Sequence, residues 1–145
     1  MLKLLGVVAL VVALTSSVTA GPSVTVHARM FLRHTGALDD DLLNGATNTS
    51  KPVRVGNLDY GVRGRELLID VAVPDGVGNQ LTVTVKQGKL NATQTWEVTV
   101  GRSFGITIAH HPMLVSPIVC GGPMTISAKV GAVTETRTIN FACSE

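Results

Sequence analysis

The side chains most suited to binding or chemistry lie between His34 and Ser50, the one long irregular stretch of the sequence. Three adjacent carboxylates occur there, followed by an amide: Asp39, Asp40, Asp41 and Asn44. These are calcium-binding groups, but an EF-hand loop starting at Asp40 would need Asp or Asn at its third position and Glu at its twelfth, where this chain has leucine and lysine. The EF-hand is excluded, while another calcium site and a solvated acidic loop stay open.

The same stretch is also the first candidate for a binding surface. It is longer than the roughly two to five residues that usually join hairpin strands, and long loops in small domains often carry function. Three aspartates would create a local negative field that favours a basic partner. We therefore expect Asp39, Asp40, Asp41 and Asn44 to contribute to binding a protein partner.

A nucleophile motif occurs once, at Gly101–Gly105, where the sequence GRSFG matches the G-x-S-x-G pattern around Ser103. That motif works when a strand and a strained turn are followed by a helix that helps to build the oxyanion hole. Here the next residues, Ile106 to Ile108, are β-branched at every position and indicate a strand. We expect no catalytic residues and interpret the chain as a non-enzyme.

The histidine pair His110-His111 is the other candidate for chemistry, because imidazole is a common metal ligand, and His27 and His34 could join it in space. Adjacent residues of a strand point to opposite faces, so the pair is poorly placed to share one ion. The chain contains no H-x-H, H-E-x-x-H or C-x-x-C motif. We expect neither a metal nor another cofactor.

The two cysteines, Cys120 and Cys143, bracket the last predicted hairpin. An even count in an exported protein favours a disulfide, and no basic residue lies close enough in sequence to activate either thiol as a nucleophile. A Cys120–Cys143 bridge is predicted.

Two sequons, Asn48-Thr49-Ser50 and Asn91-Ala92-Thr93, are candidate glycosylation sites at Asn48 and Asn91. Both fall in segments that we predict to be loops between strands, where a bulky sugar could be accommodated.

The N-terminus has the pattern of a secretory signal over residues 1–20. Lys3 is followed by an apolar run to Leu14 and by Val18-Thr19-Ala20, which matches the small-x-small cleavage pattern. The apolar run is too short for a membrane span, and no later segment is long and apolar enough. The sequence predicts a secreted, extracellular product with a single domain over residues 21–145 and no membrane span.

Charge excludes a further class of partner. The chain has 12 Lys and Arg against 10 Asp and Glu, a formal charge of +2 that falls to +1 without Lys3. Nucleic-acid-binding proteins show a strongly basic face. The nearest approach to one is Arg54, Arg63 and Arg65 around a glycine-rich loop, so we predict no nucleic-acid partner.

Apolar residues of the mature chain recur with a period of two, which indicates strands. Strands are predicted over Val24–Leu32, Leu67–Val73 and Leu81–Val85, with edge strands over Pro52–Val55 and Met113–Cys120. Hairpins are predicted for Trp96–Val100 with Phe104–Ile108, and for Met124–Ala128 with Ile139–Cys143.

Seven to nine short strands without helices predict an all-β, antiparallel β-sandwich of immunoglobulin-like or fibronectin-like type, with a small β-barrel or jelly roll as the alternative. Exported sandwiches are commonly recognition modules, so we expect a secreted module that binds a protein partner through its loops. A carrier of a lipid or other small apolar ligand between the sheets is the alternative, and an unassigned secreted enzyme is the third. Oligomeric state does not follow from the sequence.

Overall fold

The computed structural model describes residues 22–32, 34–56, 63–99, 102–103 and 106–144. The expected signal peptide over residues 1–20 lies outside these ranges. Within them the chain forms nine β-strands and no helix, so these residues contain no helix that could cross a membrane.

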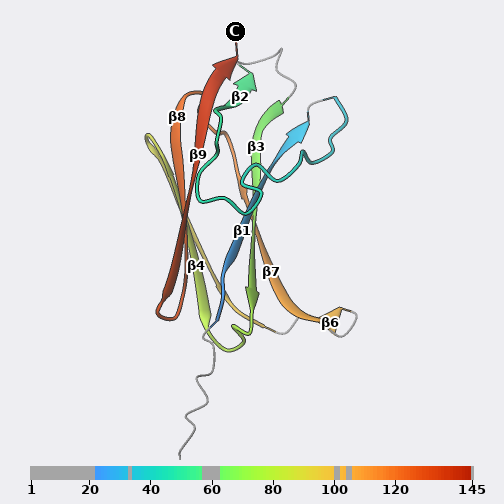
Figure 1. The fold of residues 1–145 in the computed structure, drawn as a ribbon, viewed down its shortest axis with the longest axis vertical. Coiled ribbons are helices and arrows are strands. Elements are labelled where there is room, and N and C mark those ends of the chain that lie inside the picture. The colour runs from blue at the N-terminus through green and yellow to red at the C-terminus, as the bar shows by residue number, and fades with distance from the viewer. Residues whose placement is uncertain (1–21, 33, 57–62, 100–101, 104–105, 145) are drawn as a thin grey trace, which may run out of the picture.

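The strands form two sheets that lie face to face in Figure 1. The first sheet has the order β1-β3-β7, extended beyond β7 by the two-residue β6: β1 Thr25–Leu32, β3 Arg63–Pro74, β7 Ile106–Val115 and β6 Arg102–Ser103. The second has the order β2-β9-β8-β4-β5: β2 Val53–Gly56, β9 Val133–Ser144, β8 Gly122–Val130, β4 Gln80–Gln87 and β5 Leu90–Glu97. Every pairing is antiparallel except that of β2 with β9. Both sheets are open, which is consistent with a β-sandwich and not with a closed barrel.

The core lies between the sheets and is built from the period-two pattern. Along β1, Val26, Ala28 and Met30 are buried, whereas His27 and Arg29 between them face outward. The same alternation buries one face of the partner strands: Leu67, Ile69, Val71, Leu81, Val83, Val85, Met124, Ile126 and Ala128. Each fully buried Val, Leu, Ile or Met contributes about 1.5–3 kcal/mol. The alternation that predicted the strands therefore also decides which face of each sheet is dry.

Two hairpins join neighbouring strands of the second sheet. The β8–β9 hairpin turns at Gly131, as predicted, and β4 turns into β5 at Gly88-Lys89. Both glycines have φ of 56°, a left-handed conformation that suits glycine because it has no Cβ.

The predicted hairpin of Trp96–Val100 with Phe104–Ile108 is wrong for the residues that the structure describes, and Val100 and Phe104 lie outside them. Trp96 lies on β5 opposite Leu81 of β4, whereas β7 pairs with β3 in the other sheet. The tight turn at Gly88-Lys89 folds β5 directly back onto β4. The alternation of apolar and polar residues predicts a strand but not which strand it pairs with. Pairing with β4 and the predicted pairing with Phe104–Ile108 are both compatible with it.

The predicted edge strands are confirmed in part. The strand at Val53 and Val55 is the edge strand β2, paired with Phe141 and Cys143 of β9. Of the second segment, only Met113–Val115 is strand, and the rest is a link containing the cis peptide Ser116-Pro117.

The first sequon, Asn48, lies in an irregular segment as predicted, where it forms an isolated bridge with Thr138. The second does not: Asn91 is an exposed residue of β5, opposite Lys86. Its predicted loop is only the two-residue turn before it.

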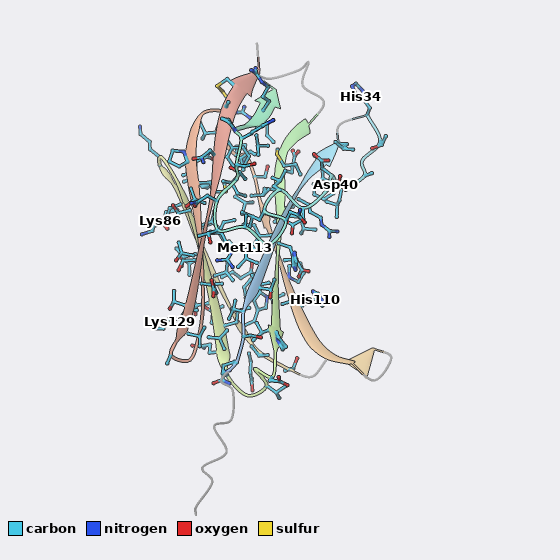
Figure 2. The ribbon with its side chains drawn as sticks, in the orientation of Figure 1. His34, Asp40, Lys86, His110, Met113 and Lys129 are labelled. Carbon is cyan, nitrogen blue, oxygen red and sulfur yellow. A yellow bond between two sulfur atoms is a disulfide. The ribbon has the colours of Figure 1, made fainter. Side chains whose placement is uncertain are left out.

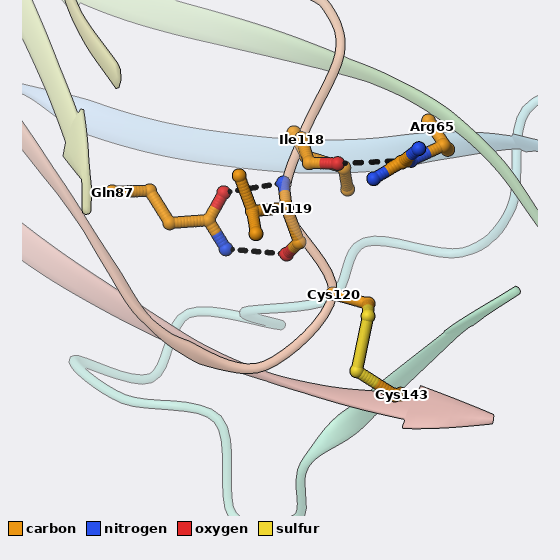
Figure 3. Close-up of a disulfide and its surroundings, with 6 residues drawn as sticks. All are labelled: Arg65, Gln87, Ile118, Val119, Cys120 and Cys143. Atoms are coloured by element: carbon orange, nitrogen blue, oxygen red, sulfur yellow. Dashed lines mark hydrogen bonds between the residues drawn. A yellow bond between two sulfur atoms is a disulfide. The ribbon is translucent and has the colours of Figure 1, made fainter. Parts of the chain in front are cut away.

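Residues 116–121, which we call the crossover link, carry the chain from β7 in one sheet to β8 in the other. The Gln87 side chain fastens this link, because its amide nitrogen donates to the Val119 carbonyl at 2.7 Å and its oxygen accepts from the Val119 amide at 2.8 Å (Figure 3). On the other sheet, Arg65 makes two hydrogen bonds with Ile118. The Ile118 amide donates to the Arg65 carbonyl at 2.9 Å, and Nε of Arg65 donates to the Ile118 carbonyl at 3.2 Å. The link is thus held to both sheets, with the Ile118 side chain fully buried.

The predicted disulfide is confirmed: Cys120 at the end of the crossover link bonds to Cys143 of β9 (Figure 3). The bridge closes a loop with a sequence separation of 23, which contains the whole β8–β9 hairpin.

Removing this bridge is expected to lower the free energy of unfolding by about 3.5 kcal/mol, the chain-entropy value for a loop of this length. The variant Cys120→Ser/Cys143→Ser avoids leaving a reactive thiol. Urea denaturation followed by fluorescence of Trp96 would give the difference, and an unchanged midpoint would contradict the expectation.

Replacing Gln87 with Ala is expected to lower the free energy of unfolding by about 1–3 kcal/mol, since both backbone groups of Val119 lose their partner. Gln87 is only 3% exposed. Gln94, an exposed glutamine of β5, offers a matched control whose replacement by Ala should change stability by less than about 0.5 kcal/mol. Equal effects of the two substitutions in thermal denaturation would show that the contacts with Val119 are not important.

Candidate functional site

The predicted binding stretch, residues 34–50, runs from the first sheet to the second and covers the side of the sandwich. Its backbone bonds first to β1, with the amide of Asp39 on the Met30 carbonyl and that of Leu42 on the Ala28 carbonyl, each at 2.8 Å. It then bonds to Thr138 of β9. The stretch is therefore held along both sheets.

Asp41 fastens this segment to β1. Its Oδ1 accepts from the amides of Ala28 at 3.0 Å and Leu43 at 3.2 Å, and its Oδ2 accepts from Nδ1 of His27 at 2.7 Å. Burial raises the pKa of Asp41, but the hydrogen bonds from the Ala28 amide, the His27 ring and the Leu43 amide together outweigh it and hold the pKa below its ordinary value. The side chain is only 13% exposed, so Asp41 is a structural group as well as a surface one.

The other predicted binding residues lie further out and do not converge with Asp41 on one point. Asp40 is exposed, and Oδ1 of Asp39 accepts from its amide at 2.9 Å. Asn44 is exposed in a left-handed turn with φ of 44°. The acidic run thus has one inward carboxylate, Asp41, and an exposed tip at Asp40.

A hollow of about 270 Å³ opens where this segment meets the outer face of the first sheet. It is lined by side chains of β1, β3 and β7 and by one from the segment: His27, Arg29, Leu68, Asp70, His110, Pro112 and Leu38. We call this the outer hollow. It combines cationic, imidazole, carboxylate and apolar groups, the mixture typical of recognition sites.

A second histidine–aspartate pair lies in the outer hollow, formed by His110 of β7 and Asp70 of β3. Nδ1 of His110 lies 2.7 Å from Oδ2 of Asp70, and the His110 side chain is 54% exposed. Asp70 stands opposite His27 on β1, so the two pairs share one face. In Figure 2 His110 and Asp40 lie on one side of the molecule, and Lys86 and Lys129 lie on the other.

Sequence reasoning missed this cluster, although part of its signal was present. The period of two in the predicted strand Val24–Leu32 puts His27 and Arg29 on its solvent-facing side. Asp70 was not singled out, because nothing in the sequence indicates that β3 lies between β1 and β7.

The expectation that His110 and His111 point to opposite faces is confirmed. His111 is buried between the sheets, where its ring lies 5.7 Å from that of Trp96. Its Nδ1 is buried without a hydrogen-bond partner. The pair therefore cannot act together at one site.

Neither sequence motif for chemistry is supported by its surroundings. Ser103 lies in β6 opposite Ile106, and the described chain continues as strand β7 where the nucleophile motif would need a helix. In the part of the chain that the structure describes, no three His, Cys, Asp or Glu side chains are grouped to hold a metal ion.

Two further hollows, of about 240 and 340 Å³, lie on the outer face of the second sheet. Each is lined by polar side chains that include one lysine: Gln80, Thr82, Lys129 and Gly131 in one, and Thr84, Lys86, Thr125, Ser127 and Thr136 in the other. Neither of these nor the outer hollow lies between the sheets.

Comparison with known proteins does not assign the chain to a family: no family model, no curated protein and no solved structure matches it.

Replacing Asp41 with Ala is expected to lower the free energy of unfolding by about 1–3 kcal/mol at neutral pH, because the Ala28 and Leu43 amides lose their acceptor. The pKa of Asp41 is lowered by folding, so its contribution is present above the pKa of the unfolded state and is lost as the pH falls through the folded-state value. The stability difference from wild type should therefore shrink below about pH 4. Asp40→Ala is the control, expected to change stability by less than about 0.5 kcal/mol in chemical denaturation at each pH.

Proposed function

We propose that this chain is a secreted, non-enzymatic recognition module that binds a protein partner. Its binding surface would comprise the outer hollow and the neighbouring exposed tip of residues 34–50. The observation that carries this proposal is the outer hollow itself, where Leu38 of the segment meets the side chains of three strands.

The proposal includes an immunoglobulin-like topology, which the order of the strands supports. An immunoglobulin constant domain has strands A, B, E and D in one sheet and C, F and G in the other. Taking β1, β3, β7 and β6 as A, B, E and D leaves β4, β8 and β9 as C, F and G, with β5 beside C. The residues from 34 to 52 would then be the link by which the first strand passes to the other sheet.

The composition of the outer hollow supports recognition. Leu114 beside it is 61% exposed and Leu38 is 38% exposed, while Arg29 supplies a charged group of the kind enriched at interfaces. Apolar groups beside oriented polar ones give both affinity and direction to a contact. The exposed tip at Asp40 favours a basic residue of the partner at the rim.

A carrier function has less support. The hollows described above open on outer faces, and the fully buried side chains of both sheets form one contiguous core cluster. Glycosylation at Asn48 and Asn91 stays part of the proposal, since both side chains are exposed.

The test is capture of the partner from extracellular fluid by the immobilised mature chain, followed by measurement of its affinity for variants. Leu38→Glu and Arg29→Glu alter the outer hollow and should weaken binding at least about tenfold, as expected for central interface residues. Lys129→Glu reverses one exposed cation on the opposite sheet and is the matched control.

Retention of the partner by the hollow variants, or its loss from Lys129→Glu alone, would contradict the proposed surface. Thermal denaturation of each variant should show that the fold is retained.

A further inference from the structure

The carboxylates at or beside the outer hollow are engaged with other groups, whereas several donors or potential donors in it are not. The oxygens of Asp41 already accept from two amides and the His27 ring, and Oδ1 of Asp70 is buried while Oδ2 is bound to His110. Arg29 is exposed, and its side chain makes no hydrogen bond or ion pair to any described residue. The polar groups left without a described partner are the guanidinium of Arg29 and the outer edges of the two imidazoles.

Each carboxylate also sets the chemistry of its histidine. Because an ionised carboxylate is an acceptor only, Nδ1 of His27 and of His110 must carry a hydrogen to make its 2.7 Å contact. In a neutral ring Nε2 is then an acceptor, and on protonation it becomes a donor. No described residue is bonded to either Nε2. Protonation of either ring therefore changes its free edge from an acceptor to a donor.

Building on the proposed function, we propose that the outer hollow binds a glutamate or aspartate side chain of the partner and that acidification strengthens this binding. The Arg29 guanidinium and the protonated Nε2 atoms of His27 and His110 would donate to the carboxylate. Leu38, Leu68 and Pro112 would contact its methylene groups.

The charges that face the two histidines account for the direction of this dependence. Asp41 is bound to His27, and Arg29 is on the same strand as His27. Asp70, on the central strand β3, stands opposite His27 and is bound to His110. With neutral rings, the two carboxylates outnumber the single guanidinium and repel an anion. With protonated rings, each imidazolium cancels its own carboxylate, and the charge of Arg29 is uncompensated.

More distant carboxylates do not reverse this result. Glu66, two residues before Leu68 on β3, accepts from the Arg65 amide at 2.9 Å, and the Asp39 oxygen accepts from the Asp40 amide. Asp40 is at the exposed tip, where solvent and salt screen it. The hollow and the tip thus favour opposite charges, which would fix the orientation of a partner that carries both.

A side-chain carboxylate is the favoured anion for two reasons. The hollow holds about 270 Å³, which is below the roughly 300–1,000 Å³ of pockets for drug-sized ligands, and three of its seven lining residues are apolar. One guanidinium and two imidazoles match the lone pairs of a single carboxylate.

The test is titration of the mature chain with two hexapeptides whose termini are blocked, at pH 5.5 and pH 8. One peptide contains a single glutamate and the other a single lysine as its only charged residue. Amide chemical shifts in nuclear magnetic resonance would give both the affinity and the face. We expect the glutamate peptide to bind about tenfold more tightly at pH 5.5, with shifts in β1, β3 and β7. Arg29→Gln should weaken its binding at both pH values, and His110→Gln should reduce the pH dependence.

The control variant is Lys129→Gln, which removes one exposed cation from the opposite face and should leave the glutamate peptide unaffected. His110 forms the more exposed pair, so His110→Gln should fold even if His27→Gln does not. Tighter binding of the lysine peptide, an affinity independent of pH, or shifts confined to β4 and β8 would overturn the inference.

Inorganic phosphate and acetate, added as competitors at equal ionic strength, separate the two sources of anion. Competition by phosphate at a concentration tenfold below that of acetate would overturn the choice of a carboxylate. If a captured partner is sensitive to Leu38→Glu while the glutamate peptide fails to bind, this inference is wrong and the proposed function stands. If the glutamate peptide binds here but the partner binds Leu38→Glu and Arg29→Glu with unchanged affinity, the proposed function is wrong instead.

Discussion

The free edge of β1 is the constraint on which the arrangement of the candidate site depends. One edge of this strand pairs with β3, and the backbone groups on its other edge need partners or water. Residues 34–50 supply them: Leu42 and Asp39 donate to the carbonyls of Ala28 and Met30, and the Asp41 carboxylate accepts from the Ala28 amide. Closing this edge brings Leu38 and Asp41 to the outer face of the sheet, where the candidate site lies.

A second constraint acts where the two sheets meet at the crossover link. A link between sheets has no strand neighbour, so its backbone groups depend on side chains or on isolated bonds. The amide of Gln87 satisfies both groups of Val119, and the backbone of Arg65 accepts from Ile118. The buried Gln87 side chain thus supplies the hydrogen bonds that a neighbouring strand supplies within a sheet. The Cys120–Cys143 bond joins the same link to β9.

These two constraints explain why the charged surface is ordered. Two of its charged groups, Asp41 and Asp70, are engaged with histidines at 2.7 Å rather than free in solvent. An oriented imidazole presents one ring nitrogen in a set direction, which a flexible loop histidine does not. The proposed recognition surface is therefore a sheet face with one covering segment, and a solvated acidic loop is too simple a description for Asp41.

The sequence by itself determined the position of β1, β3, β4, β8 and β9, the buried face of each, the final hairpin and the disulfide, because each depends on local alternation, on turn residues or on the only two cysteines. It also indicated residues 34–50 as a candidate surface from their length and charge. The neighbours of each strand were decided only by the tertiary structure, as the misplaced partner of Trp96 and the strand position of Asn91 illustrate. The same holds for the outer hollow: His27, Asp70 and His110 are far apart in the chain, and they meet because β3 lies between β1 and β7. Alternation is a property of one strand, whereas pairing depends on how whole faces pack, and that information is not local.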